Sequence, residues 1–368
     1  MRVLVLANFG MGLFKFRKEL LEELIRQGHE VYVSLPNDDY VPKLKELGCK
    51  YIESSVDRRG TNPINDIKLL YQYIKIIKRI KPDVVLTYTV KPNIYGGIAC
   101  GITKTPYLTN VTGLGTAIEN TGIIQKITLK LYRLGLRSSS CVFFQNEYNR
   151  SFFVKKNITK SNMRLIPGSG VNLEHHNYED YPSTDKEIRF LFIGRIMKAK
   201  GIEELFQASK KIKVIYPNVE FHLVGGTEED YTKQLAKLEQ LGVIKYHGQQ
   251  SDVHSFIKVS HCTILPSYHE GTANVLLETA ATGRPILASK VSGCKETFDN
   301  DITGLGFEVR NVSSLIEAII KFIKLPYKQK KQMGIKGREK MEEEYDRKLV
   351  IDAYLQEIEK LKYKENLK

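Results

Sequence analysis

The length and composition of this chain of 368 residues exclude several classes of protein. Domains usually hold about 100–200 residues, so the length predicts two of them. Hydrophobic residues make up 42% and charged residues 27% of the chain, which suits buried cores and excludes disorder throughout. No apolar run reaches the roughly 18 residues of a membrane span, and the opening run is too short for a signal peptide. The five cysteines form no Cys-x-x-Cys pair, which indicates reduced thiols in the cytoplasm.

The charge of the chain is unevenly distributed. The formal net charge is +14, and residues 1–172 hold 26 Lys and Arg against 13 Asp and Glu. The remaining residues are almost balanced, with 30 basic and 29 acidic side chains. A basic excess confined to one half is typical of a protein that meets nucleic acid, a membrane surface or a phosphorylated ligand. A merely solvated basic surface is the other interpretation.

The first half alternates short β-branched runs with segments of helical periodicity, which indicates βαβ units and a parallel sheet. The pattern predicts strands at 3–7, 29–35, 82–89, 105–113 and 141–146. It also predicts a helix that ends at Gly28 and a Lys-rich helix at 66–81.

The same alternation starts again after residue 170. It predicts strands at 188–195, 218–225, 261–267 and 284–289, and helices at 201–215, 230–241 and 274–283. We therefore expect an α/β protein with two parallel-sheet domains, which we place at 1–168 and 169–346. The last helix, within 347–368, is expected to pack back on the first domain. Ligands of such sheets bind at the carboxyl ends of the strands.

Two basic residues follow the predicted strand 188–195. Arg195 comes directly after Gly194, and Lys200 closes the turn that leads into the next helix. A guanidinium and an ammonium placed in this way could hold two phosphates, the guanidinium in a bidentate manner. Taken alone, such residues are more often surface charges on a strand–helix loop.

A second cluster precedes and enters the predicted helix 274–283. Gly271 allows close backbone approach, Thr272 or Asn274 could cap the helix, and the helix start favours an anion. Glu270 precedes this start, and Glu278 lies about two turns into an apolar segment. A carboxylate in apolar surroundings needs hydrogen-bond donors, and sugar or ribose hydroxyls are suitable ones. Neither residue needs a ligand to explain it. Glu270 could be an acid that interacts with the helix dipole, and Glu278 could be a partly solvated helix residue.

In combination, GRIMKAKG (194–201) and PSYHEGTANVLLETAATGRPILAS (266–289) resemble the signature of family 4 of the retaining nucleotide-sugar glycosyltransferases, including its Glu-x7-Glu motif. The segments 166–172 and 246–253 resemble the family's entry to the second domain and its base-recognition turn. In the first half, four segments resemble the bacterial capsule and O-antigen subgroup: 14–20, 57–63, 88–97 and 109–115. That subgroup extends a lipid-diphosphate-linked sugar at the cytoplasmic membrane face.

The resemblance implies the GT-B fold, in which two Rossmann-like domains face a central cleft, and a UDP-sugar as donor. Arg195 and Lys200 would neutralise the donor diphosphate, which is the leaving group. The implied contacts of the remaining donor-site residues are the transferred sugar for Glu270, the distal phosphate for Gly271 and Thr272, the ribose for Glu278 and the base for His247 and Gly248. The implied acceptor is an undecaprenyl-diphosphate-linked saccharide.

The acceptor side departs from the family pattern. Many members carry a histidine in the loop after the fourth strand, whereas this loop reads Thr89-Val90-Lys91-Pro92-Asn93. Lys91 could contact acceptor phosphate or remain a solvated lysine, and Asn93 is a further candidate contact. The turn Gly10-Met11-Gly12 is predicted to be a close-approach loop that lacks the complete GxGxxG fingerprint. Lys15 and Arg17, which follow this turn, are candidate acceptor-phosphate contacts or helix-surface charges.

No metal or other cofactor is expected. Asp299-Asn300-Asp301 matches the Asp-x-Asp pattern of another glycosyltransferase architecture, but its context predicts a turn. The histidines lack the helical i, i+4 spacing of a zinc site, and no cysteine cluster exists.

The segment 125–137 resembles a membrane-surface amphipathic helix. Four basic residues, Lys126, Lys130, Arg133 and Arg137, are predicted along one side and Ile127, Leu131 and Leu134 along another. We therefore expect a peripheral enzyme at the inner face of a bacterial plasma membrane with anionic lipids as a partner. A domain helix with a basic solvent face is the alternative.

Two other functions remain open. A nucleotide-sugar 2-epimerase would use the same architecture, although the Arg195, Lys200, Glu270 and Glu278 set favours glycosyl transfer. A nucleic-acid-binding protein would explain the charge, but the chain has no Trp and no recognition-helix or stacking motif, so no nucleic-acid partner is expected.

Overall fold

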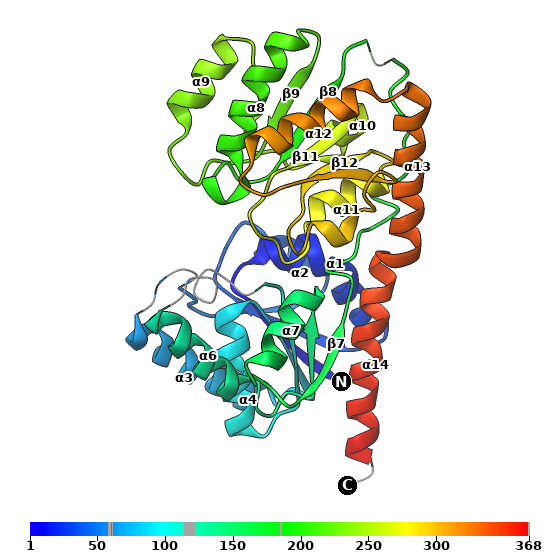
Figure 1. Cartoon of the computed structure of the whole chain (residues 1–368). Helices are drawn as coiled ribbons and strands as arrows, with labels where there is room; N and C mark the ends of the chain where they lie inside the picture. The colour runs from blue at the N-terminus through cyan, green and yellow to red at the C-terminus, as the bar shows by residue number, and fades with distance from the viewer. Residues whose placement is uncertain (58–59, 61, 114–121, 185, 367–368) are drawn as a thin grey trace. The chain divides into compact units, whose positions relative to one another are not determined.

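The computed structural model describes residues 1–57, 60, 62–113, 122–184 and 186–366, with only the backbone described for 364–366. The chain divides into two compact units, one of Met1–Ser169 with Lys348–Lys368 and one of Gly170–Arg347. Each unit contains one parallel sheet with helices on both faces, which is the predicted α/β architecture (Figure 1).

The first unit is built on a seven-stranded sheet in the order β3-β2-β1-β4-β5-β6-β7. Its strands are β1 (Arg2–Leu6), β2 (Glu30–Leu35), β3 (Lys50–Glu53), β4 (Val84–Tyr88), β5 (Tyr107–Val111), β6 (Cys141–Phe144) and β7 (Asn162–Leu165). Its described helices are α1 (Gly10–Arg26), α2 (Val41–Glu46), α3 (Pro63–Ile80), the π-helix η1 (Pro92–Gly96), α4 (Gly97–Thr103), α6 (Ile123–Gly135), α7 (Glu147–Lys155) and α14 (Arg347–Asn366).

Alternating side chains of the central strands supply the cores on the two faces of this sheet. Val3 and Val5 of β1 pack with residues of α1 and α14, whereas Leu4 and Leu6 pack with residues of α3 and α4. This alternation explains why the strand was predicted as an uninterrupted apolar run, since both faces are covered.

The last helix, α14, is part of the first unit. Tyr354 of α14 is 1% exposed, and its ring centroid lies 4.4 Å from that of Phe143 on β6. The amide nitrogen of Asn110 on β5 donates a hydrogen bond of 2.6 Å to the Tyr354 hydroxyl. The helix is therefore fixed to the sheet by ring packing and by a buried polar contact.

The second unit contains a six-stranded parallel sheet in the order β10-β9-β8-β11-β12-β13. Its strands are β8 (Arg189–Ile193), β9 (Glu220–Val224), β10 (Lys245–Tyr246), β11 (Cys262–Leu265), β12 (Ile286–Ser289) and β13 (Gly304–Phe307). Its described helices are η2 (Lys198–Lys200), α8 (Ile202–Ile215), α9 (Thr232–Gln240), α10 (His254–Val259), α11 (Asn274–Ala281), η3 (Lys295–Thr297), α12 (Val312–Lys324) and α13 (Tyr327–Glu344).

Every strand and helix predicted from the sequence is present, with ends shifted by a few residues. Several other elements were not predicted from the sequence: β3, β7, β10, α2, α4, α7, α10, α12 and α13. The helix α13 shows why. Few apolar residues mark this helix because two glycines contribute to its buried side. A Cβ added to Gly334 would lie 2.0 Å from the carbonyl oxygen of Gly283, so close backbone approach replaces apolar periodicity here.

Candidate active site

Glycines bring three strand ends of the second unit close together. Gly194 follows β8, Gly225 follows β9, and Gly248 lies just beyond β10. The Gly225 amide donates to the Gly248 carbonyl at 2.8 Å, and a Cβ added to Gly225 would lie 1.9 Å from the Gly194 oxygen. This edge carries the carboxyl ends of parallel strands, where α/β sheets bind ligands.

Lys200 and Glu270 form an ion pair at this edge. Lys200 ends η2 after β8, and Glu270 lies in the loop between β11 and α11. The Lys200 ammonium donates to Glu270 Oε1, and the Ser267 hydroxyl donates to the same oxygen at 2.7 Å. The two charged side chains are only 18% and 14% exposed. The structure thus brings together two predicted site residues, and it adds Ser267, which the sequence did not single out.

Backbone contacts hold the two loops around this ion pair in place. Gly201 has a φ of +69°, and a Cβ there would lie 2.1 Å from the carbonyl oxygen of Pro266. The Tyr268 amide donates to the Ala199 carbonyl at 3.0 Å, and the Tyr268 hydroxyl donates to Glu204 at 2.8 Å. The position of Lys200 is therefore set by the backbone of the neighbouring loop.

Arg195 pairs with a residue that the sequence analysis missed. Its guanidinium donates to Glu228 Oε2 at 2.9 Å, and the Arg195 side chain is 51% exposed. The loop that holds Glu228 is attached to the Arg195 turn by a bridge between Ile196 and Thr227. Five N–H donors allow a guanidinium to keep such a partner and still contact an anion.

The start of α11 differs from the predicted capped helix. The N-cap residue is Ala273, which provides no side-chain cap. The Ala273 amide instead donates to the carbonyl of Gly293 at 2.8 Å, so a loop that follows β12 takes over this role. The buried Oδ1 of Asn274 has no hydrogen-bond partner among the described residues. A Cβ on Gly293 would lie 2.4 Å from the Glu270 carbonyl, so this loop also encloses the Glu270 backbone.

Glu278 lies next to a histidine cluster that the sequence analysis did not use. The His176 Nε2 atom is 4.0 Å from Glu278 Oε1, and their side chains are 7% and 18% exposed. Burial, together with the neighbouring His175 and His254, lowers the pKa of His176 to about 3. His176 is therefore neutral near pH 7, and this contact is not an ion pair between full charges.

His247 is part of a chain of polar contacts that leads to Glu220. His247 Nε2 lies 3.0 Å from His222 Nδ1, and His222 Nε2 lies 3.1 Å from Glu220 Oε2. Burial would raise the pKa of Glu220, but the hydrogen bonds from Lys245 and His222 outweigh it and lower the pKa to about 2. Because ionised Glu220 only accepts, His222 must carry its proton on Nε2. Burial also lowers the pKa of both histidines.

The candidate acceptor residues near Gly10 differ in part from the prediction. Residues 10–12 form the first turn of α1 and not a loop, and a Cβ on Gly12 would lie 2.7 Å from the Phe9 ring. Lys15 is exposed, but Arg17 is 4% exposed and its guanidinium lies 5.2 Å from the centre of the Tyr88 ring. Arg17 is thus neither a helix-surface charge nor an accessible phosphate ligand in this structure.

The loop after β4 is tied down by Asp66 of α3. Lys91 Nζ lies 2.7 Å from Asp66 Oδ1, and the Tyr95 hydroxyl donates to Asp66 Oδ2 at 2.8 Å. Lys91 is therefore an ion-paired side chain and not a solvated one. Asn93, the other candidate acceptor contact in this loop, is fully buried, and its side-chain amide donates to the Asn110 carbonyl at 2.8 Å.

The Asp-x-Asp segment lies in a turn, as predicted. Lys340 Nζ is 3.2 Å from Asp299, Lys321 Nζ is 2.5 Å from Asp301, and the Gly306 amide donates to Asn300 Oδ1 at 2.7 Å. In the described part of the chain, no cluster of three or more His, Cys, Asp and Glu side chains has the arrangement of a metal site. The described helices include none that is both long and apolar enough to span a bilayer.

Two family models match the chain, one in each compact unit. The model of glycosyl transferases group 1 matches residues 176–340, and the glycosyl transferase 4-like model matches residues 2–146. The chain belongs to glycosyltransferase family 4. The family expected from the motifs is thereby confirmed, and neither model supports the epimerase alternative.

The glycosyltransferase is similar to bacterial enzymes over most of its length. It is 28% identical over 336 residues to the N,N'-diacetylbacillosaminyl-diphospho-undecaprenol alpha-1,3-N-acetylgalactosaminyltransferase of Campylobacter jejuni, covering 87% of this chain and 88% of the relative. It is 25% identical over 335 residues to the UDP-Gal:alpha-D-GlcNAc-diphosphoundecaprenol alpha-1,3-galactosyltransferase of Escherichia coli, covering 82% and 85%. The crystal structure of Anabaena HepE in complex with UDP-glucose matches with a TM-score of 0.79 at 18% identity, covering 99% and 100%, and the fold is GT-B.

Proposed function

We propose that this glycosyltransferase moves a sugar from a UDP-sugar to a lipid-diphosphate-linked saccharide with retention of configuration, without a metal ion. The observation that carries the donor half is the Lys200–Glu270 pair at the carboxyl ends of β8 and β11. The lipid-linked acceptor is inferred from the two named relatives, which act on undecaprenyl-diphosphate-linked sugars by their names.

The chemistry of the second unit suits the departure of a nucleoside diphosphate. Cleavage of the sugar–phosphate bond leaves negative charge on the distal phosphate, and fixed donors aimed at such charge contribute about 2.7–4 kcal/mol each. Lys200 has three N–H donors, so it can hold Glu270 and still donate to a phosphate oxygen. Arg195 can likewise stay bound to Glu228 and donate to a second phosphate oxygen. The charges of Lys200 and Arg195 would together take the place of a divalent metal ion.

Glu270 would bind the hydroxyls of the transferred sugar beside the leaving group. Its Oε1 atom is occupied by Lys200 and Ser267, whereas a carboxylate offers further lone pairs on both oxygens. Glu278, held near neutral His176, would accept hydrogen bonds from the ribose hydroxyls. The proposal assigns no side chain as a nucleophile. The acceptor hydroxyl would therefore attack the anomeric carbon of the sugar from the same face that the leaving group departs from.

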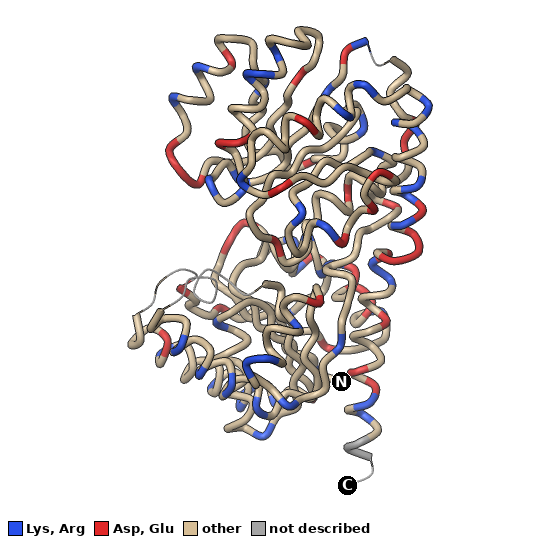
Figure 2. The backbone as a smooth tube through the Cα atoms, viewed as in Figure 1, with Lys and Arg blue, Asp and Glu red and all other residues tan. Residues whose placement is uncertain are grey.

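The exposed side of α6 supports a membrane-surface location for the first unit. Four large apolar side chains are more than half exposed there: Ile123, Ile124, Ile127 and Leu134. Lys126 and Lys130 are exposed on the same helix, and basic residues recur along the helices of this part of the unit (Figure 2). The apolar and basic side chains share one exposed face, in contrast to the two separate sides that the sequence predicted. Such a mixed face suits insertion into an anionic interface.

The donor and acceptor are tested together by a panel of nucleotide-sugars incubated with lipid extracts of bacterial membranes in detergent. We expect release of nucleotide from a UDP-sugar only when the lipid-linked saccharide fraction is added. Release from none of the donors, or an equal rate without lipid, would overturn the assignment. Appearance of a 2-epimer without acceptor would instead favour the isomerase.

Membrane association is tested separately by co-sedimentation with liposomes. Binding is expected only with anionic lipid and should weaken as salt rises, because lysines near an anionic leaflet contribute about 1 kcal/mol each. A Lys126→Ala/Lys130→Ala variant should bind less than a Lys210→Ala/Lys211→Ala control, which loses the same charge from the second unit. Salt-independent binding, or equal binding of both variants, would contradict this part of the proposal.

A further inference from the structure

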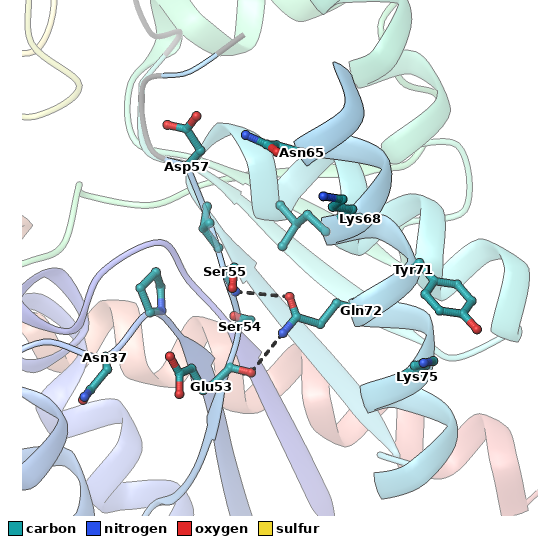
Figure 3. Close-up of a pocket in the computed structure, with 13 residues that line it drawn as sticks. Asn37, Glu53, Ser54, Ser55, Asp57, Asn65, Lys68, Tyr71, Gln72 and Lys75 are labelled. Carbon is teal, nitrogen blue, oxygen red and sulfur yellow. Dashed lines mark hydrogen bonds between the residues drawn. The ribbon is translucent and has the colours of Figure 1, made fainter. Parts of the chain in front are cut away.

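A pocket in the first unit contains none of the residues that the sequence analysis assigned to the acceptor. It has a volume of about 690 Å³ and lies between α3 and the chain that leaves β2 and β3 (Figure 3). The pocket is lined on the strand side by Asn37, Glu53, Ser55 and Asp57, among others, and on the helix side by Asn65, Lys68, Tyr71 and Gln72. Its volume falls in the range of about 300–1,000 Å³ that is usual for small-molecule sites.

The pocket lies at the carboxyl ends of β2 and β3, and α/β folds bind their ligands at such strand ends. The Ser54 amide donates to the Leu35 carbonyl at 3.1 Å, so the chain beyond β3 continues beside the end of β2. Both strands therefore open into the pocket at their carboxyl ends. Gln72 of α3 closes the floor, since its Oε1 accepts from the Ser55 amide at 3.1 Å and its Nε2 donates to the Glu53 carbonyl at 3.3 Å (Figure 3).

The helix that forms the wall of this pocket also holds the loop after β4. Asp66 in the first turn of α3 binds Lys91 and Tyr95, as described above, whereas the adjacent Asn65 and the following Lys68 line the pocket. The pocket wall and the residue that holds this loop therefore belong to the same turn of α3.

The lining favours a neutral, hydroxyl-rich ligand. Carboxylates, amides and hydroxyls line the pocket. A sugar hydroxyl can donate a hydrogen bond to a carboxylate and accept one from an amide N–H or from another hydroxyl. The cations Lys68 and Lys75 are balanced by the anions Glu53 and Asp57, which lowers the affinity for phosphate. Lys75 is in addition held 4.5 Å from the ring centre of Tyr71. We propose that this pocket binds the saccharide part of the acceptor. The inference rests on the proposed function and names its acceptor subsite.

The test measures saccharide binding by saturation-transfer NMR on the full chain in the presence of UDP. The probes are N-acetylglucosamine, N-acetylgalactosamine, galactose and glucose. At least one probe should bind, and Lys68→Ala should weaken it by about tenfold, the equivalent of 1.4 kcal/mol. The matched control is Lys78→Ala, which removes the same charge from an exposed position of α3 outside the pocket. Asn65→Ala, also at an exposed position, provides a second variant with the same expected loss.

The outcomes separate this inference from the donor assignment. Calorimetry should show that both pocket variants bind UDP as the unmodified chain does, while Lys200→Ala keeps saccharide binding in the pocket. Saccharide binding that survives Lys68→Ala and Asn65→Ala, or the failure of all four probes to bind, would overturn the subsite. Displacement of a bound probe by inorganic phosphate would also overturn it, because the pocket would then be an anion site. Failure of UDP to bind the unmodified chain would overturn the donor assignment and leave the pocket result to stand by itself.

Discussion

Gly201 and Pro266 are packed backbone to backbone at the edge of the second sheet. A Cβ on Gly201 would lie 2.1 Å from the Pro266 carbonyl oxygen, and the φ of Gly201 is +69°. Only glycine meets both conditions, since a side chain is disfavoured by the left-handed backbone and excluded by the contact. The turn that ends in Lys200 is therefore fixed against the loop that carries Glu270.

The Gly201→Ala substitution should destabilise the chain and reduce its activity. The left-handed conformation costs about 1–2 kcal/mol for alanine, and the clash with Pro266 adds to it. Gly242 is a matched control, because its φ is +64° and nothing lies within 4 Å of an added Cβ. Urea denaturation should show a larger loss for Gly201→Ala than for Gly242→Ala, and only the former should impair turnover. Equal losses would mean that the loop yields to the methyl group.

The Lys200→Ala variant should lose turnover while keeping its fold. Removal of one preorganised donor to a developing charge typically lowers kcat by about 10²–10³-fold. Lys198, in the same short helix and 64% exposed, is the charge-matched control. Rates measured with the UDP-sugar identified in the panel should fall for Lys200→Ala and stay unchanged for Lys198→Ala, with melting temperatures close to that of the unmodified chain. Full turnover in Lys200→Ala would remove this residue from the site.

The neutral state of buried His176 should make the stability of the second unit depend on pH. Burial lowers the pKa of His176 from 6.5 to about 3 in the folded chain, with a further contribution from His175, His254 and Arg347, whereas Asp252 opposes the shift. Below pH 6.5 the unfolded chain binds a proton that the folded chain excludes, so stability falls as the pH drops toward 3. The expected loss from this group between pH 7 and pH 5 is about 2 kcal/mol.

Urea denaturation at several pH values measures this contribution. The His176→Gln variant lacks the titrating ring, so its stability should vary less between pH 7 and pH 5 than that of the unmodified chain. Parallel pH curves for the two proteins would show that His176 does not carry this dependence.

The contact between Asn110 and Tyr354 should contribute to the attachment of α14. Tyr354→Phe leaves the buried Asn110 amide without the hydroxyl to which it donates, and an unsatisfied buried group costs about 1–3 kcal/mol. Tyr363 on the same helix is 70% exposed, and its change to Phe should alter stability by less than about 0.5 kcal/mol. Chemical denaturation of both variants compares them directly. If Tyr354→Phe is as stable as Tyr363→Phe, ring packing alone holds the helix.

The local sequence was sufficient for the central strands of both sheets, for several of the helices and for the motifs of the candidate donor site. Uninterrupted apolar runs such as 3–7 identify strands that are buried on both faces, and the glycines of 194–201 and 271 mark turns that follow β8 and β11. These signals are local because they depend on side-chain periodicity and on backbone conformations that few residues adopt. The sequence also placed Glu270 beside a helix start, where the structure has it.

Only the tertiary structure decided which of these residues meet. Arg195 pairs with Glu228, Lys91 with Asp66, and the start of α11 with Gly293, and none of these contacts leaves a trace in local periodicity. The burial of Arg17 and Asn93 was likewise not predictable, because polar residues carry no apolar signal even where they face a core. Contacts between residues far apart in the chain depend on how strands are ordered in the sheet, and that order is a property of the fold as a whole.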